Sequence, residues 1–132
     1  MNFIDLVKDR QSVRRFSPKP IEEEKIDLCL EALRLAPSAC NSQPWKNILV
    51  KNPELRDEVA NATFSATVSF NKFVAEANLI LVMVLEKPKI ITQIGGRIKN
   101  KEYPLIDIGI AAEHFCLQAA ELGIGTCMLG WF

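Results

Sequence analysis

Residues 104–122 read PLIDIGIAAEHFCLQAAEL, and this stretch decides the fold. Its apolar residues recur at helical spacing, and its many small residues permit close packing against a neighbouring element. The recurring positions are Leu105, Ile108, Ala112, Phe115, Cys116 and Ala119. Gly123 follows as the expected C-cap, because glycine tolerates the left-handed conformation that ends many helices. We therefore predict a long, closely packed helix, followed by a strand at residues 126–131.

Further helices and strands are expected on the N-terminal side of this stretch. The patterns predict helices at residues 3–9, 22–36 and 53–66, and strands at residues 47–50 and 78–85. The run at 78–85 is continuously apolar, which is typical of a strand buried on both faces, so we expect it to be the central strand. Residues 86–103 are polar and basic and contain Gly95 and Gly96. They predict a mobile excursion that is a candidate lid.

Composition restricts the class of protein. The chain has 132 residues, of which 48% are hydrophobic and 24% charged, so we expect one compact domain over residues 1–132. Sixteen basic and sixteen acidic side chains cancel, which argues against a general nucleic-acid or anionic-membrane binder. No apolar run reaches the roughly 20 residues that span a bilayer, and the N-terminus lacks a secretory signal. We expect a cytoplasmic protein with an α/β or α+β layered fold.

No protein side chain is a convincing catalyst. The four cysteines lack zinc spacing and are expected to be free thiols, and the single histidine, His114, is expected to be a partly buried helix residue. Phosphate loops of the GxxxxGK[ST] and GxGxxG types are absent, as are GxSxG and HExxH. We therefore predict no metal site and no catalytic side chain, and expect the chemistry to come from an organic cofactor.

The segment at residues 10–16 is the first candidate binding site. Arg10, Ser12 and Arg14 alternate, so in an extended backbone their side chains point to one side. Two guanidinium groups and a hydroxyl can bind one phosphate. The alternative is a solvated basic turn, because exposed arginines are common.

Three stretches of the chain resemble the nitroreductase family of FMN-dependent flavoproteins. They are RQSVRRF at residues 10–16, APSACNSQPW at residues 36–45, and the region from DIGIAAEH at residue 107 to ELGIGTCMLGWF at residues 121–132. The resemblance covers essentially the whole chain. It implies an α+β fold, a three-layer α/β/α sandwich around a mainly antiparallel mixed sheet, and a homodimer with two FMN molecules bound across the subunit interface.

The resemblance also assigns cofactor-binding residues. The FMN phosphate, ribityl chain and pyrimidine edge match Arg10, Gln11 (through its backbone), Ser12 and Arg14. The loop that reaches the flavin from the partner subunit matches Pro37, Ser38, Ala39 and Asn41, and is shaped by Gln43, Pro44 and Trp45. Asn71 resembles a residue that hydrogen-bonds the flavin ring. Gly130 and Trp131 match positions whose backbone amides face the flavin near N5 and O4.

The chain departs from the family at its C-terminal end. Family members usually continue for some tens of residues, and that tail crosses the dimer, adds a strand and supplies a Lys or Arg to the FMN phosphate. We expect a shortened or truncated domain in which the C-terminal strand is missing and FMN is bound through fewer contacts. Whether the 132-residue form retains FMN is left open.

The function that the resemblance implies is FMN-dependent transfer of hydride from NADH or NADPH to a small, electron-poor acceptor such as a nitroaromatic or quinone. The alternatives are a non-catalytic flavin-binding or dimerisation module, and another FMN reaction such as dehalogenation or flavin breakdown. Several residues also have purely structural interpretations. Gly123 and Gly125 can cap a helix and form a turn, Trp131 can fill the core, and Glu113 and His114 can be ordinary helix residues.

Overall fold

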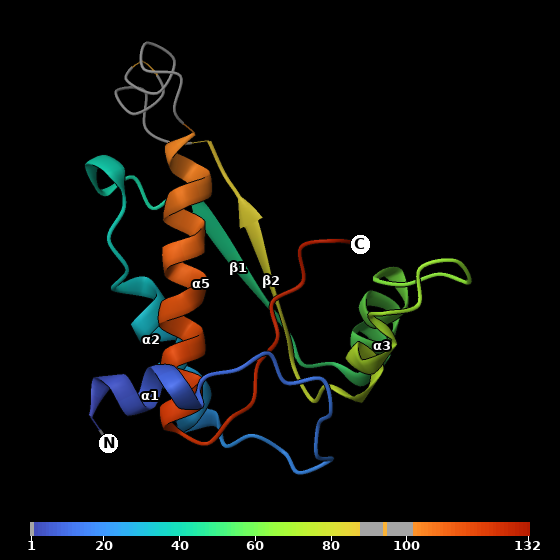
Figure 1. Ribbon diagram of the computed structural model, residues 1–132. Coiled ribbons are helices and arrows are strands. Elements are labelled where there is room, and N and C mark those ends of the chain that lie inside the picture. The colour runs from blue at the N-terminus through green and yellow to red at the C-terminus, as the bar shows by residue number, and fades with distance from the viewer. Residues whose placement is uncertain (1, 88–93, 95–101) are drawn as a thin grey trace.

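The computed structural model describes residues 2–87, 94 and 102–132 (Figure 1). The α-helices are α1 (Phe3–Asp9), α2 (Glu23–Arg34), α3 (Pro53–Ala62) and α5 (Tyr103–Glu121). Short 3-10 helices are η1 (Ala39–Asn41) and η2 (Lys72–Glu76), and the strands are β1 (Trp45–Val50) and β2 (Ile80–Leu85). The excursion predicted at residues 86–103 lies for the most part outside the described residues.

The helix ends follow local capping chemistry, as the sequence predicted. The Asn2 side chain accepts a hydrogen bond from the Asp5 amide at 3.0 Å and so begins α1. At the other end of the chain, Gly123 has a φ of +74° directly after α5. The Ile124 amide then donates to the Ala119 carbonyl at 2.8 Å, which closes the helix in the manner of a Schellman motif. The long helix predicted at residues 104–122 is therefore confirmed.

The two predicted strands form one antiparallel, two-stranded sheet, and the long connection between them contains α3 and η2. Trp45 pairs with Leu85 at one end of the ladder, and Val50 pairs with Ile80 at the other. Two expectations about β2 were wrong. Its residues are half-buried or exposed, and it pairs only with β1 in the part of the chain that the structure describes, so it is not a central strand buried on both faces. A continuous apolar run cannot indicate whether neighbouring elements cover both of its faces.

The prediction of a strand at residues 126–131 is also wrong. Thr126 forms one isolated parallel bridge with Ser12, supported by a 2.8 Å hydrogen bond from the Val13 amide to the Thr126 carbonyl. Residues 127–132 form no ladder. Strand formation needs a paired neighbour along its length, and only one residue of this segment has one.

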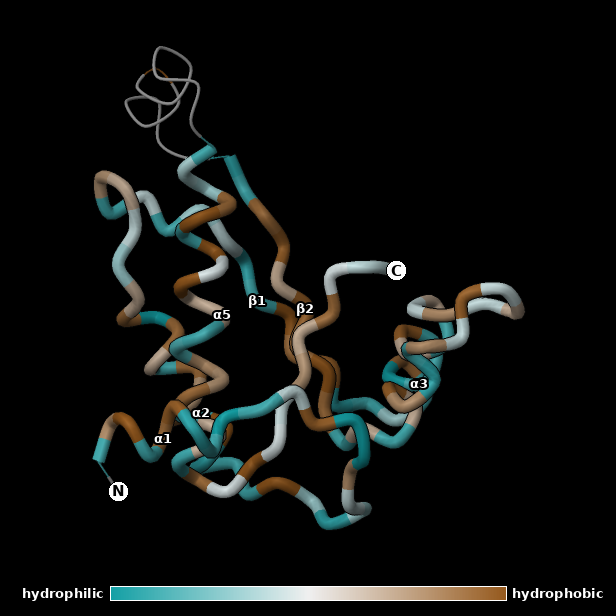
Figure 2. The backbone as a smooth tube through the Cα atoms, viewed as in Figure 1, coloured by the Kyte–Doolittle hydropathy of each residue, from teal (hydrophilic) through white to brown (hydrophobic). Residues whose placement is uncertain are grey.

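Helices α2 and α5 pack together and cover one face of the β1–β2 sheet (Figure 1). Leu33, Ala36 and Ala111 form the buried centre of this contact, and Leu81 and Met83 of β2 pack against them. Figure 2 shows hydrophobic residues on both α5 and β2. The α+β class predicted from the sequence is confirmed. None of the helices in the described ranges is long and apolar enough to cross a membrane.

Gly125 is required where the chain passes residues 10–14. A Cβ atom at Gly125 would lie 2.9 Å from the Val13 Cγ2 atom, closer than side chains tolerate. We predict that Gly125→Ala lowers the free energy of unfolding by about 1–3 kcal/mol through overpacking. The matched control is Gly109→Ala on α5, where nothing lies within 4 Å of the added Cβ. Chemical denaturation should show the control unchanged or stabilised by up to about 1 kcal/mol. Equal stabilities for the two variants would contradict the close approach.

Candidate functional site

The predicted phosphate-binding segment is extended and ordered by contacts with the C-terminal part of the chain. The bridge between Ser12 and Thr126 fixes its backbone. The Arg10 Nε atom lies 3.3 Å from the Glu113 Oε1 atom of α5, and the Arg14 Nη1 atom donates to the Ser12 carbonyl at 3.3 Å. Gln11, Ser12 and Arg14 are exposed, so their polar groups face solvent. The segment is a structured basic strip rather than a loose solvated turn.

A small cavity lies beneath this strip. It has a volume of about 190 Å³ and is lined by Asp9, Arg10, Gln11 and Val13 together with residues that follow α5, among them Gly123 and Thr126. Ser12 and Arg14 are not part of its lining. Ligand pockets for whole small molecules usually measure about 300–1,000 Å³. The cavity is thus large enough for part of a cofactor, such as a phosphate or a short polyol, and too small for a complete flavin nucleotide.

The second predicted group lies in a loop with unusual backbone geometry. Cys40, Asn41 and Gln43 all have positive φ values, of 54°, 48° and 47°. Residues other than glycine seldom adopt this region, and they keep it only where surrounding contacts determine it. The Ser38 hydroxyl accepts a hydrogen bond from the Gln43 amide at 2.9 Å, and the Gln43 side chain donates to the Asn41 side chain at 2.8 Å.

A buried carboxylate on α5 joins this loop to the rest of the fold. The Asp107 Oδ2 atom accepts a hydrogen bond from the Ala39 amide at 3.1 Å. Asp107 is only 4% exposed. The residue pattern assigned Asp107 no role of its own, because nothing near it in the sequence connects it with a loop 68 residues earlier.

The structure does not bring the two groups together within one chain. Arg10 contacts Glu113 near the middle of α5, whereas the loop containing Ser38 and Asn41 is joined to Asp107 near the beginning of the same helix (Figure 1). One subunit therefore presents a basic strip and a rigid polar loop at separate places. The sequence predicted that the loop serves a second subunit, and this arrangement leaves that prediction standing and untested.

Three other predicted residues do come together. Asn71 is 4% exposed, and its Nδ2 atom donates to the Thr63 carbonyl at 3.0 Å and to the Trp131 carbonyl at 2.8 Å. The Trp131 ring is 74% exposed and makes an edge-to-face contact with Phe70 at 6.2 Å between centroids. Trp131 is thus not a core residue. Gly130 beside it is exposed, and a Cβ there would meet nothing within 4 Å.

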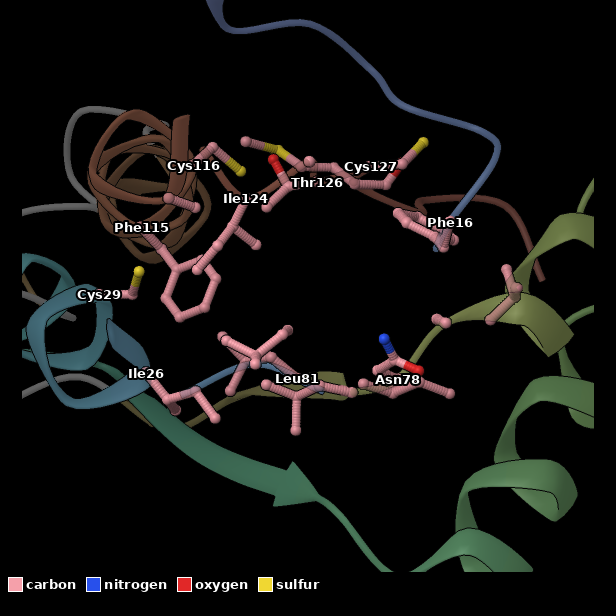
Figure 3. A pocket seen from close by; sticks show the side chains of 18 of the residues that line it. Phe16, Ile26, Cys29, Asn78, Leu81, Phe115, Cys116, Ile124, Thr126 and Cys127 are labelled. Carbon is pink, nitrogen blue, oxygen red and sulfur yellow. The ribbon is translucent and has the colours of Figure 1, made fainter. Parts of the chain in front are cut away.

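A second, larger cavity is mainly apolar and lies between α2, α5, β2 and the C-terminal segment (Figure 3). Its volume is about 710 Å³. Figure 3 shows Ile26, Phe115, Leu81 and Ile124 around the opening, with Cys29 at its edge. Its lining also includes one ion pair, in which the Lys25 Nζ atom lies 2.5 Å from the Glu22 Oε2 atom. The described residues contain no group of His, Cys, Asp and Glu side chains that could hold a metal ion.

The cysteines near this cavity are free thiols, as predicted. Burial, reinforced by neighbouring Cys116, raises the pKa of Cys29 from 9.0 to about 11. Burial also raises the pKa of Cys116, although a hydrogen bond with Thr126 acts in the opposite direction. Both thiols are therefore neutral at physiological pH and are poor nucleophiles. His114, half-buried as predicted, contacts the Ala32 carbonyl through Nδ1 at 3.2 Å.

Fold and site together define an α+β domain in which one long helix contacts both a basic extended segment and a strained polar loop. The family model described as "Nitroreductase family" matches residues 7–132. The chain belongs to the nitroreductase family.

Individual relatives agree with this assignment. A crystal structure of a nitroreductase family protein from Clostridium novyi is 32% identical, with a TM-score of 0.85, over 100% of this chain and 71% of that one. An FMN-dependent nitroreductase from Clostridium difficile is 31% identical, with a TM-score of 0.75, over 95% of this chain and 64% of that one. A candidate NADH dehydrogenase/NAD(P)H nitroreductase from Archaeoglobus fulgidus is 30% identical over 96% of this chain. The chain spans 66% and 61% of the lengths of the first two curated relatives.

We predict that Asn71 holds the C-terminal segment in place. Asn71→Asp replaces an amide donor by an acceptor that faces the Thr63 and Trp131 carbonyls, and should cost about 1–3 kcal/mol of unfolding free energy. In a Trp45→Phe background, Trp131 is the only tryptophan, and its emission should shift as the segment detaches. Asn71→Ala serves as the comparison, because it removes the donor without adding repulsion. Unchanged emission and stability in both variants would show that these hydrogen bonds contribute little.

Proposed function

We propose that this chain forms the cofactor-binding part of an FMN-dependent oxidoreductase. The observation that carries the proposal is the membership of the chain in the nitroreductase family, together with the ordered, extended segment that contains Arg10, Ser12 and Arg14. Relatives named FMN reductase and oxygen-insensitive NADPH nitroreductase support it. When bound, FMN would supply the redox chemistry, taking hydride from NADH or NADPH and passing it to an electron-poor acceptor such as a nitroaromatic or quinone.

The residues of the chain would bind and orient this cofactor. The guanidinium groups of Arg10 and Arg14 are suited to the dianionic phosphate, and the Ser12 hydroxyl adds a short donor. The open backbone at Gly130 and Trp131 would face the ring, where amides can stabilise charge that develops on reduction. Asn71 would act at the same place, because its amide group fixes the Trp131 carbonyl.

The loop with Pro37, Ser38, Ala39 and Asn41 is proposed to reach the flavin of a partner subunit in a homodimer. Support for this proposal comes from the family to which the chain belongs and from the exposed polar groups of the loop, of which Asn41 is one. A single domain spanning residues 1–132 and a cytoplasmic location are also retained as proposals. The 61–66% coverage of the curated relatives means that the activity of the whole protein is part of the proposal.

The direct test is the absorbance spectrum of the purified protein, followed by a turnover assay. Oxidised flavin has a visible absorption band, and NADH or NADPH oxidation with a nitro or quinone acceptor reports the reaction. Flavin binding without turnover would favour a non-catalytic flavin-binding module. Turnover of halogenated compounds or of the flavin itself would favour another FMN reaction. Absence of flavin after reconstitution with FMN would refute the proposal.

Arg10 offers a quantitative test of cofactor binding. Arg10→Ala is expected to weaken FMN affinity by about 1.5–3 kcal/mol, because a charge-assisted phosphate contact is removed. Riboflavin lacks the phosphate, so its affinity should change much less. Glu113→Gln is the matched control, since it removes the ion pair with Arg10 and leaves the guanidinium in place. An equal loss of affinity for FMN and riboflavin would show that Arg10 acts through the fold rather than through the phosphate.

Assembly provides an independent test. If the loop serves a neighbouring flavin, the protein should be a dimer, and dilution should release FMN as the subunits separate. Light scattering measures the mass, and flavin fluorescence, which rises on release, measures the bound fraction. A folded monomer that retains FMN would reject the shared site while leaving the flavoprotein assignment intact.

A further inference from the structure

Asp107 is a buried charged residue that the mechanism above does not use. It lies in the second turn of α5 and is 4% exposed. A carboxylate seldom occupies such a position without a specific partner, because removing it from water is costly. The described partner is the Ala39 amide, whose nitrogen lies 3.1 Å from Oδ2. The contact joins a rigid helix to the first residue of η1.

The loop on the other side of this contact needs support. Cys40, Asn41 and Gln43 hold left-handed backbone conformations that relaxed non-glycine residues avoid. Hydrogen bonds within the loop define its shape, namely those from Gln43 to Ser38 and to Asn41. Such internal bonds do not determine where the loop lies relative to the remainder of the fold. The bond from Ala39 to Asp107 ties the beginning of the loop to α5, which packs against α2. Beyond its other end, the buried Pro44 accepts a hydrogen bond from the Glu86 amide at 2.9 Å.

We propose that Asp107 is a positioning residue that holds the loop of residues 38–43 in the orientation needed for cofactor binding. Its carboxylate accepts a hydrogen bond from the Ala39 amide, and this contact fixes the positions of Ser38 and Asn41 relative to α5. A charged acceptor makes a stronger hydrogen bond than a neutral one, which suits an attachment point for a strained segment. The part of this inference that concerns FMN rests on the proposed function. The part that concerns the loop does not.

The experiment compares three variants of the full chain. Asp107→Leu removes the acceptor and keeps a side chain branched at Cγ, although Leu is the larger residue, and Asp107→Asn retains an uncharged acceptor oxygen at nearly the same volume. Val50→Ala is the control for general loss of stability, because Val50 is a buried β1 residue at the end of the strand away from the loop. Two quantities are measured in each: hydrogen exchange at the Ala39 amide, and the dissociation constants of FMN and riboflavin at a concentration where the subunits are associated.

The expected result is a local and graded effect. In Asp107→Leu, exchange at Ala39 should accelerate by roughly ten- to hundredfold relative to the amides at the centre of α5, and Asp107→Asn should fall between it and the unaltered chain. The affinities for FMN and for riboflavin should fall by the same factor, about tenfold in Asp107→Leu, because the loop is not proposed to bind the phosphate. Val50→Ala should lower the melting temperature without a selective change at Ala39 and without a change in flavin affinity.

Two results would overturn the inference. The first is an Asp107→Leu variant in which exchange at Ala39 rises no more than at the centre of α5, because Asp107 would then not order the loop. The second is a loosened loop with unchanged affinity for both flavins, which would make the contact purely structural. If the unaltered chain binds no flavin, the proposed function fails, and exchange at Ala39 still decides whether Asp107 positions the loop.

Discussion

Close packing of α5 on its neighbours is the constraint on which the rest of the structure depends. Ala111 and Ala119 are fully buried, and Cys116 between them is 5% exposed, so the buried side of the helix consists of small groups. Small side chains let α2 and the sheet approach closely, and the burial of apolar surface is the main force that holds such layers together. Gly123 then ends the helix and redirects the chain past Val13, which leaves no room for a side chain at Gly125.

The same helix carries the attachment points of both candidate binding groups. Asp107 contacts the polar loop, and Glu113 contacts Arg10 of the basic strip. At 1.5 Å per residue, these two side chains start about 9 Å apart along the helix axis. The helix therefore sets the spacing between the two attachment points. In a site shared between two subunits, the strip of one copy would combine with the loop of the other.

The interior of the domain contributes shape rather than reactive groups. The apolar cavity between α5 and β2 is bordered by Cys29 and Cys116, whose thiols stay protonated because burial disfavours the thiolate. The polar groups suited to ligand binding lie outside this region, on extended segments and loops. A rigid helical layer that supports exposed loops is a common way for a small domain to position a cofactor.

The sequence by itself determined the elements whose stability is local. Helical periodicity together with Asn2 and Gly123 predicted α1 and α5 closely, because caps and i, i+4 spacing act within a few residues. The family motifs also located the basic strip and the polar loop. Only the tertiary structure decided that residues 126–131 form a single bridge and that β2 is not buried on both faces. It alone showed the contacts of Asp107 with Ala39 and of Glu113 with Arg10, since both are ordinary polar positions on a helix in the sequence. Pairing and burial depend on partners that lie tens of residues away, and the residue pattern within one segment carries no information about those distances.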